Sequence, residues 1–347
     1  MPDASQFTQI KRLQTSAAAD QGAGRNKFRA PRFFDGWNQG QLIKFGQNAL
    51  LSNKFIPRFV SRWIVSAFFN TALGGNVVSV FVDSADNVYL GFTGYLFKIT
   101  PSGTLISNEV GANGITVIGP HVFVTTGGLI NRYLASDLSL ANTPADPAVA
   151  GGFQQITGLV GSRTIAADSV GRLLYVSNSA LRRSTISPTN GSSTSVNISG
   201  VEINNARHLV IRVINGIEYA YVVEGGVNQI IRYNLSAASF PTAKQVIITG
   251  LNGPRGLAFE SDTVIYISDS GNNRIMKFDT VTNTLTRFAG TGAASSTGNG
   301  GDPLLATFNT PAGIAFSNDR KTLYVPEENA STTRDVAAIR FTTDQIN

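Results

Sequence analysis

An internal repeat is the feature that most constrains the fold of this chain of 347 residues. One copy reads Pro254-Arg-Gly-Leu-Ala-Phe259, then Val264-Ile-Tyr-Ile-Ser-Asp269, then Arg274-Ile-Met-Lys-Phe-Asp279. A second copy begins at Pro311, and weaker copies begin near positions 77, 115, 163 and 207. Each copy holds short runs of apolar, β-branched and aromatic residues between Gly, Asn and Asp, a pattern typical of antiparallel strands joined by tight turns.

One aromatic residue in the second strand of each copy marks the register of the repeat: Tyr89, Phe123, Tyr175, Tyr221, Tyr266 and Tyr324. Successive markers lie on average about 40–50 residues apart, the length of a four-stranded propeller blade. A blade has two apolar faces and buries both only by stacking on neighbours in a closed ring. The sequence therefore predicts an all-β fold, a six-bladed β-propeller of four-stranded antiparallel blades with an extended N-terminal arm. A seven-bladed ring is the structural alternative.

The two ends of the repeat region predict how the ring closes. The last copy stops after its third strand, at Phe341, while an apolar segment at residues 59–69 precedes the first copy and has no blade of its own. We expect residues 59–69 to form the outer strand of the last blade, which would hide an edge strand. The predicted domains are a basic and aromatic arm at residues 1–58 and a propeller at residues 59–347.

The segments Phe288-Ala-Gly-Thr-Gly292 and Thr297-Gly-Asn-Gly-Gly-Asp-Pro303, with the strand motif up to Phe316, resemble the NHL-repeat consensus. NHL-like propellers include protein-binding and RNA-binding modules, a metal-dependent lyase and distant lactonase-like relatives. The resemblance therefore implies a propeller fold and leaves both binding and enzymatic functions open.

The amino-acid composition argues against a metal site and against catalysis by a nucleophilic side chain. The chain has no cysteine and only two histidines, His121 and His208, in different repeats, so neither thiolate chemistry nor a histidine-rich metal site is expected. Oxygen ligands for calcium could come only from residues that follow the second strands: Thr125, Asn178, Glu224, Asp269 and Glu327. Few of these are charged, and we expect them to cap turns, with Asp269 pairing with Arg274 across its hairpin. The prediction is no catalytic residue, no metal and no cofactor.

Three arginines occupy similar positions just before the inner strands of consecutive repeats: Arg163, Arg207 and Arg255. In a propeller, such positions gather on one rim of the central channel. Guanidinium groups bind carboxylate and phosphate groups by paired hydrogen bonds, so these residues are candidates for an anion-binding site. The alternative is that they are inherited with the repeat and form salt bridges between blades.

The arm carries the positive charge of the chain. Residues 1–70 hold ten lysines and arginines against three acidic residues, while the chain as a whole has a net charge of +6. We expect the arm to anchor the protein to other subunits through its basic and aromatic side chains, namely Lys11, Arg12, Arg25, Lys27, Phe28, Arg29, Arg32, Phe33, Phe34 and Trp37. Its first twenty residues contain no apolar h-region, so no signal peptide is expected, and no apolar run is long enough to span a membrane.

The stretch Asp3-Ala-Ser-Gln-Phe-Thr-Gln-Ile-Lys-Arg12 is similar to the N-termini of some proteins of large DNA viruses. This resemblance implies a minor, capsid-associated virion component located in the virion or the host cytoplasm. The predicted function is a non-enzymatic assembly protein, a propeller anchored in a larger structure by its arm. The alternatives are a nucleic-acid-binding NHL module and a metal-dependent lactonase-like hydrolase.

Overall fold

The computed structural model describes residues 58–69, 76–126, 128–141, 156, 159, 163–186, 193–329 and 335–346. The arm residues that we expect to anchor the protein lie outside these ranges. The chain divides into two compact units, Met1–Ser61 with Thr343–Asn347, and Arg62–Thr342. The second unit contains the whole repeat region and is described below. Within the described residues, no helix has the length and apolar character needed to cross a bilayer.

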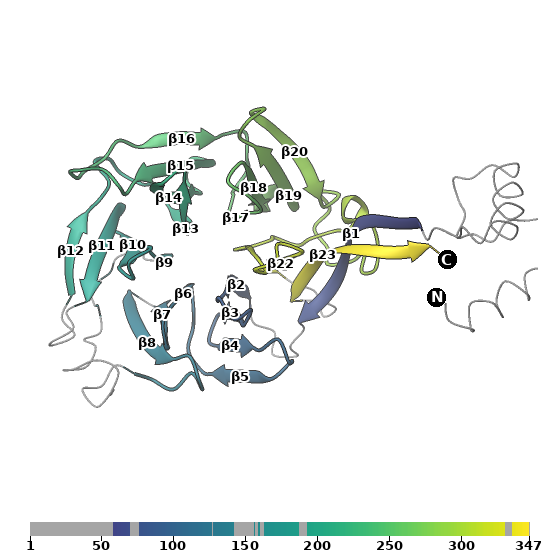
Figure 1. Ribbon diagram of the computed structural model, residues 1–347, viewed down its shortest axis with the longest axis horizontal. Coiled ribbons are helices and arrows are strands. Elements are labelled where there is room, and N and C mark those ends of the chain that lie inside the picture. The colour runs from purple at the N-terminus through teal and green to yellow at the C-terminus, as the bar shows by residue number, and fades with distance from the viewer. Residues whose placement is uncertain are drawn as a thin grey trace, which may run out of the picture. The chain divides into compact units, whose positions relative to one another are not determined.

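The first three blades follow one another along the chain (Figure 1). Blade 1 consists of β2 (Val77–Val82), β3 (Val88–Phe92), β4 (Leu96–Ile99) and β5 (Leu105–Asn108). Blade 2 consists of β6 (Gly114–Ile118), β7 (His121–Thr126) and β8 (Leu129–Leu134). Blade 3 consists of β9 (Ile165–Ala167), β10 (Leu173–Ser177), β11 (Ala180–Ile186) and β12 (Ser193–Asn197). In the described part of blade 2, two isolated bridges, Ile130 with Ile156 and Tyr133 with Leu140, stand beside the third strand in place of a fourth strand.

The last three blades each have four strands. Blade 4 consists of β13 (Ala206–Ile214), β14 (Ile217–Glu224), β15 (Gln229–Asn234) and β16 (Gln245–Ile248). Blade 5 consists of β17 (Gly256–Phe259), β18 (Val264–Asp269), β19 (Arg274–Asp279) and β20 (Thr284–Ala289), with a 3-10 turn η3 (Ser270–Asn272) between β18 and β19. Blade 6 follows a second 3-10 turn, η4 (Pro303–Leu305), and consists of β21 (Ala315–Phe316), β22 (Thr322–Pro326), β23 (Val336–Ile346) and β1 (Arg58–Phe69).

The predicted six-bladed propeller is confirmed. The six antiparallel sheets surround a common centre, with the first strand of each blade innermost (Figure 1). Each inner strand contacts the inner strand of the next blade, and β2 of blade 1 contacts β21 of blade 6, which closes the ring. The seven-bladed alternative is therefore wrong.

The core consists of apolar layers between neighbouring blades. The aromatic residues that mark the repeat belong to these layers, and five of the six are buried. Tyr221 of blade 4, for example, meets Phe259 of blade 5 edge-on at 4.9 Å between ring centroids. Nearer the axis the blades approach more closely, because a Cβ atom on Gly256 would lie 2.6 Å from the carbonyl oxygen of Ala312. The sheets can stack this tightly only where such small residues allow it.

Strand β1 lies outside β23 in the sheet of blade 6. Its Val65 side chain is fully buried in the layer between blades 5 and 6. Trp63 packs edge-on against Phe288 of β20, and Phe69 contacts Phe97 of β4. This strand thus brings N-terminal residues against side chains of blades 5, 6 and 1. The division of the chain into an arm of residues 1–58 and a propeller of residues 59–347 stays a prediction.

Candidate functional site

The central channel is the main concave site of the propeller. It has a volume of about 370 Å³ and is lined by residues of all six inner strands. Each chain segment enters its blade at the inner strand and moves outward, so the inner strands all run in one direction along the channel. Residues at the starts of these strands consequently meet at one mouth of the channel, and residues at their ends meet at the other.

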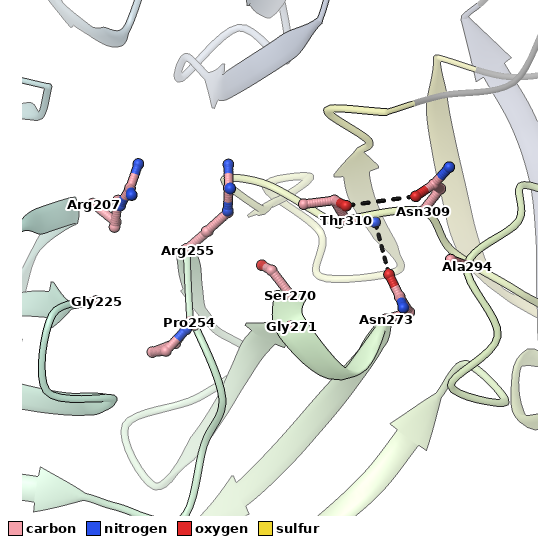
Figure 2. Close-up of a pocket in the computed structure, with 11 residues that line it drawn as sticks. Arg207, Gly225, Pro254, Arg255, Ser270, Gly271, Asn273, Ala294, Asn309 and Thr310 are labelled. Carbon is pink, nitrogen blue, oxygen red and sulfur yellow. Dashed lines mark hydrogen bonds between the residues drawn. The ribbon is translucent and has the colours of Figure 1, made fainter.

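The structure places the three sequence-predicted arginines at the same mouth. Arg163 precedes β9, Arg207 lies near the start of β13, and Arg255 precedes β17, so they come from three consecutive blades. Figure 2 shows the side chains of Arg207 and Arg255 next to each other and extending in the same direction. Both line a hollow of about 280 Å³ whose wall also includes Gly225 and Ser270.

The pairing of these arginines differs. Arg255 forms an ion pair with Glu328, which follows β22 of the neighbouring blade. Arg163 and Arg207 make neither a hydrogen bond nor an ion pair with the described residues. Burial lowers the pKa of the Arg207 guanidinium below its ordinary value, and the nearby charges of Arg255 and Arg163 lower it further, while Glu328 partly opposes them. The mouth therefore holds two positive charges without a carboxylate partner among the described residues.

A β-bulge shapes the wall beside Arg207. The pairing of β13 with β14 shifts register between Ala206 and His208, so Arg207 is the extra residue. Such bulges redirect side chains. The imidazole of His208 reaches blade 5, where its Nδ1 accepts a hydrogen bond of 3.2 Å from the backbone N–H of Leu257. Burial lowers the pKa of His208 to about 4, so the ring is neutral near pH 7.

Three buried carboxylates at the ends of second strands bind protein donors. Glu224, Asp269 and Glu327 each accept a backbone N–H from the loop that leads into the inner strand of the same blade, at 2.7, 2.6 and 2.7 Å. The donors are Asn204, Asn252 and Asn309. Asp269 also accepts Nε–H of Arg274 at 2.8 Å, which confirms the hairpin ion pair predicted from the sequence. These carboxylates therefore fasten the inner strands at the arginine-bearing mouth.

The other candidates for oxygen ligands have different roles. Asn178 adopts a left-handed conformation, with φ of 48°, in the turn between β10 and β11. Thr125 is fully buried, and its hydroxyl has no hydrogen-bond partner among the described residues. In the part of the chain that the structure describes, no group of three or more His, Asp or Glu side chains is arranged to hold a metal ion.

Two features of this site had no local counterpart in the sequence. Glu328 lies 73 positions after Arg255 and in the next blade, so the ion pair depends on the stacking of blades. The contact of His208 with Leu257 likewise joins two blades, and a lone histidine in a repeat gives no indication of it. The repeat can predict the contact of Arg255 with Glu328 and that of His208 with Leu257 only after blades 4, 5 and 6 are known to follow one another around the ring.

Comparisons with known proteins agree on the fold. No family model matches the chain, and no curated protein matches it. An auxiliary nutrient binding protein from Bacteroides ovatus has a TM-score of 0.60 and 15% identity, covering 82% of this chain and 78% of its own. A protein of unknown function from Bacteroides thetaiotaomicron has a TM-score of 0.59 and 12% identity, covering 82% and 77%. A streptogramin B lyase has a TM-score of 0.51 and 12% identity, covering 81% and 98%. At these identities the likeness shows a shared fold only. Membership of the NHL family is not confirmed, and the resemblance of the arm to viral proteins finds no support.

Proposed function

We propose that the protein is a non-enzymatic binding protein whose propeller receives an anionic group at the arginine-bearing mouth of its central channel. The observation that carries this proposal is the position of Arg163 and Arg207, which lie near each other at the mouth and have no carboxylate partner among the described residues. Like charges held together in a partly desolvated site are unfavourable, and a bound carboxylate or phosphate would relieve the repulsion through charge-assisted hydrogen bonds.

The arrangement of carboxylates favours binding over hydrolysis. A metal-dependent hydrolase of the lactonase-like class would need several carboxylates free to hold a cation at the mouth. Here Glu224, Asp269 and Glu327 direct their oxygens to backbone and side-chain donors of the protein. The solved structures with similar folds include both a binding protein and a lyase, so they do not choose between the two classes.

Replacing both unpaired arginines should abolish anion binding. We expect the R163A/R207A variant to bind acetate or inorganic phosphate at least tenfold more weakly than the parent, because a hydrogen bond to a charged group contributes about 1.5–3 kcal/mol. Isothermal titration calorimetry at constant ionic strength would measure this. The matched control is R287A/K321A, which removes two positive charges from exposed positions outside the channel. If both variants bound the anion equally weakly, the loss of affinity would come from the lower net charge, and the proposed site would be refuted.

A second variant tests the position of Arg207 without changing charge. Gly225 packs against this side chain, and a Cβ atom there would lie 2.9 Å from Cγ of Arg207 and 3.4 Å from its Nε. The G225A substitution should therefore displace the guanidinium and weaken anion binding while the net charge stays constant. Unchanged binding in G225A would argue that Arg207 does not contact the anion.

For the arm, the proposal is that residues 1–58 anchor the propeller in a larger assembly. Its support is the concentration of positive charge and aromatic side chains in a segment without repeat pattern. A capsid-associated role is the most specific form of this idea, and it rests on the arm sequence alone. Deleting residues 1–40 should abolish co-purification with partner subunits and leave the circular dichroism spectrum of the propeller unchanged. Undiminished co-purification would refute anchoring, and recovery of nucleic acid with the full chain would favour the nucleic-acid-binding alternative.

A further inference from the structure

The imidazole of His208 belongs to the channel wall. Leu257 pairs with Ile267 of β18 along one edge of β17, which is the innermost strand of blade 5. The N–H of Leu257 that reaches His208 leaves from the free edge of that strand, where β13 and β17 approach each other. Both His208 and Leu257 line the channel. The bulge thus lets two consecutive residues, Arg207 and His208, both line the channel, with the imidazole of His208 against blade 5.

The hydrogen bond to Leu257 fixes which ring nitrogen of His208 carries the proton. Nδ1 accepts the backbone N–H, so the proton of the neutral ring is on Nε2. The described residues offer this Nε2–H no hydrogen-bond partner. Nε2 is not among the buried polar atoms that lack a partner, so this donor is accessible from the channel. His208 therefore presents an uncharged donor in the channel wall, directly after Arg207 in the chain.

A buried polar group without a protein partner lies in the neighbouring blade. Thr164 follows Arg163 as His208 follows Arg207, and β9 contacts β13. Its side chain is 2% exposed, it lines the channel, and its Oγ1 has no hydrogen-bond partner among the described residues. At two adjacent inner strands, β9 and β13, an arginine without a carboxylate partner is thus followed by a neutral polar side chain. In each of these neutral side chains, one polar atom has no partner among the described residues.

We propose that the ligand is a hydroxy- or keto-carboxylate, whose anionic group binds Arg163 and Arg207 and whose neighbouring uncharged oxygen accepts the Nε2–H of His208. This inference rests on the proposed function and adds the chemical class of the ligand. A simple anion would accept hydrogen bonds from the guanidinium groups but would offer no acceptor to the Nε2–H of His208. An oxygen on the carbon next to the carboxylate would reach a donor beside the arginines, and a hydroxyl there could in addition bind Thr164.

The test compares acetate with glycolate, which differ by one hydroxyl group and carry the same charge. We expect the full-length protein to bind glycolate about five- to tenfold more tightly than acetate, as one additional hydrogen bond allows. In H208A the Nε2–H donor is removed without a replacement donor, and a water molecule can take the place of Nδ1 as acceptor for Leu257. This variant should bind both anions with the affinity of the parent for acetate.

The outcomes separate the two proposals. Equal affinities of the parent for acetate and glycolate, both lost in R163A/R207A, would overturn the assignment of the ligand class and leave the anion site intact. A preference for glycolate that persists in H208A would also overturn it. Binding of neither anion, or binding that R163A/R207A leaves unchanged, would overturn the anion site and the ligand class together.

Discussion

Replacing Val65 of β1 by aspartate should unfold the propeller. Val65 is fully buried in the apolar layer between blades 5 and 6, and its backbone N–H donates to the carbonyl of Gly301 at 3.1 Å. A carboxylate at this position would be desolvated within an apolar layer, which costs several kcal/mol. That loss is comparable with the entire stability of an ordinary domain, about 5–15 kcal/mol. We expect V65D to accumulate as insoluble protein or to melt far below the parent.

The matched control for V65D is A67D, because Ala67 is exposed on the same strand. It should remain soluble and melt within a few degrees of the parent. The corresponding truncations extend the test to the whole strand. Removing residues 1–57 should leave a folded propeller, whereas removing residues 1–69 should expose the outer edge of β23 and the partners of Trp63 and Phe69, and so cause aggregation. Equal solubility of the two truncations, or of V65D and A67D, would show that β1 is dispensable for ring closure.

The fold could be predicted because the propeller repeats one local pattern. The aromatic residue in the second strand fixes the register of each copy, and a blade with two apolar faces has no stable alternative to stacking. The prediction was least complete for blade 2, whose described part has three paired strands and two isolated bridges, Ile130 with Ile156 and Tyr133 with Leu140.

The site was only partly predictable, because its decisive contacts cross between blades. The repeat brought Arg163, Arg207 and Arg255 to the same mouth of the channel. It could not show that Glu328 neutralises the last of them and leaves the other two without a carboxylate partner among the described residues. Nor does an ordinary alternation of side chains predict the bulge at Arg207, since a bulge depends on the strand pairing and not on the residue types alone.

Acid should destabilise the protein through His208 in a defined range of pH. The pKa of His208 is lowered from 6.5 to about 4 in the folded state, chiefly by desolvation. Above pH 6.5 the ring is neutral in both states and contributes no pH dependence. As the pH falls from about 6.5 to 4, the unfolded chain binds the proton first, so the free energy of unfolding decreases. Because the ring is half-buried, the complete shift sets an upper limit of about 3 kcal/mol for this loss.

The comparison of the parent with H208N isolates this contribution. All acidic residues are the same in both proteins, so their contributions to the pH dependence cancel in the difference. Urea unfolding at pH 7.5 and pH 4.5 should show that the parent loses about 1–2.5 kcal/mol more than H208N over this interval. Since the asparagine side chain introduced in H208N does not titrate, this variant should approach or exceed the parent in stability at pH 4.5 even if it is less stable at pH 7.5. An equal loss in the two proteins would mean that His208 is protonated as easily in the folded channel as in the unfolded chain, and the desolvation of this ring by the channel wall would be refuted.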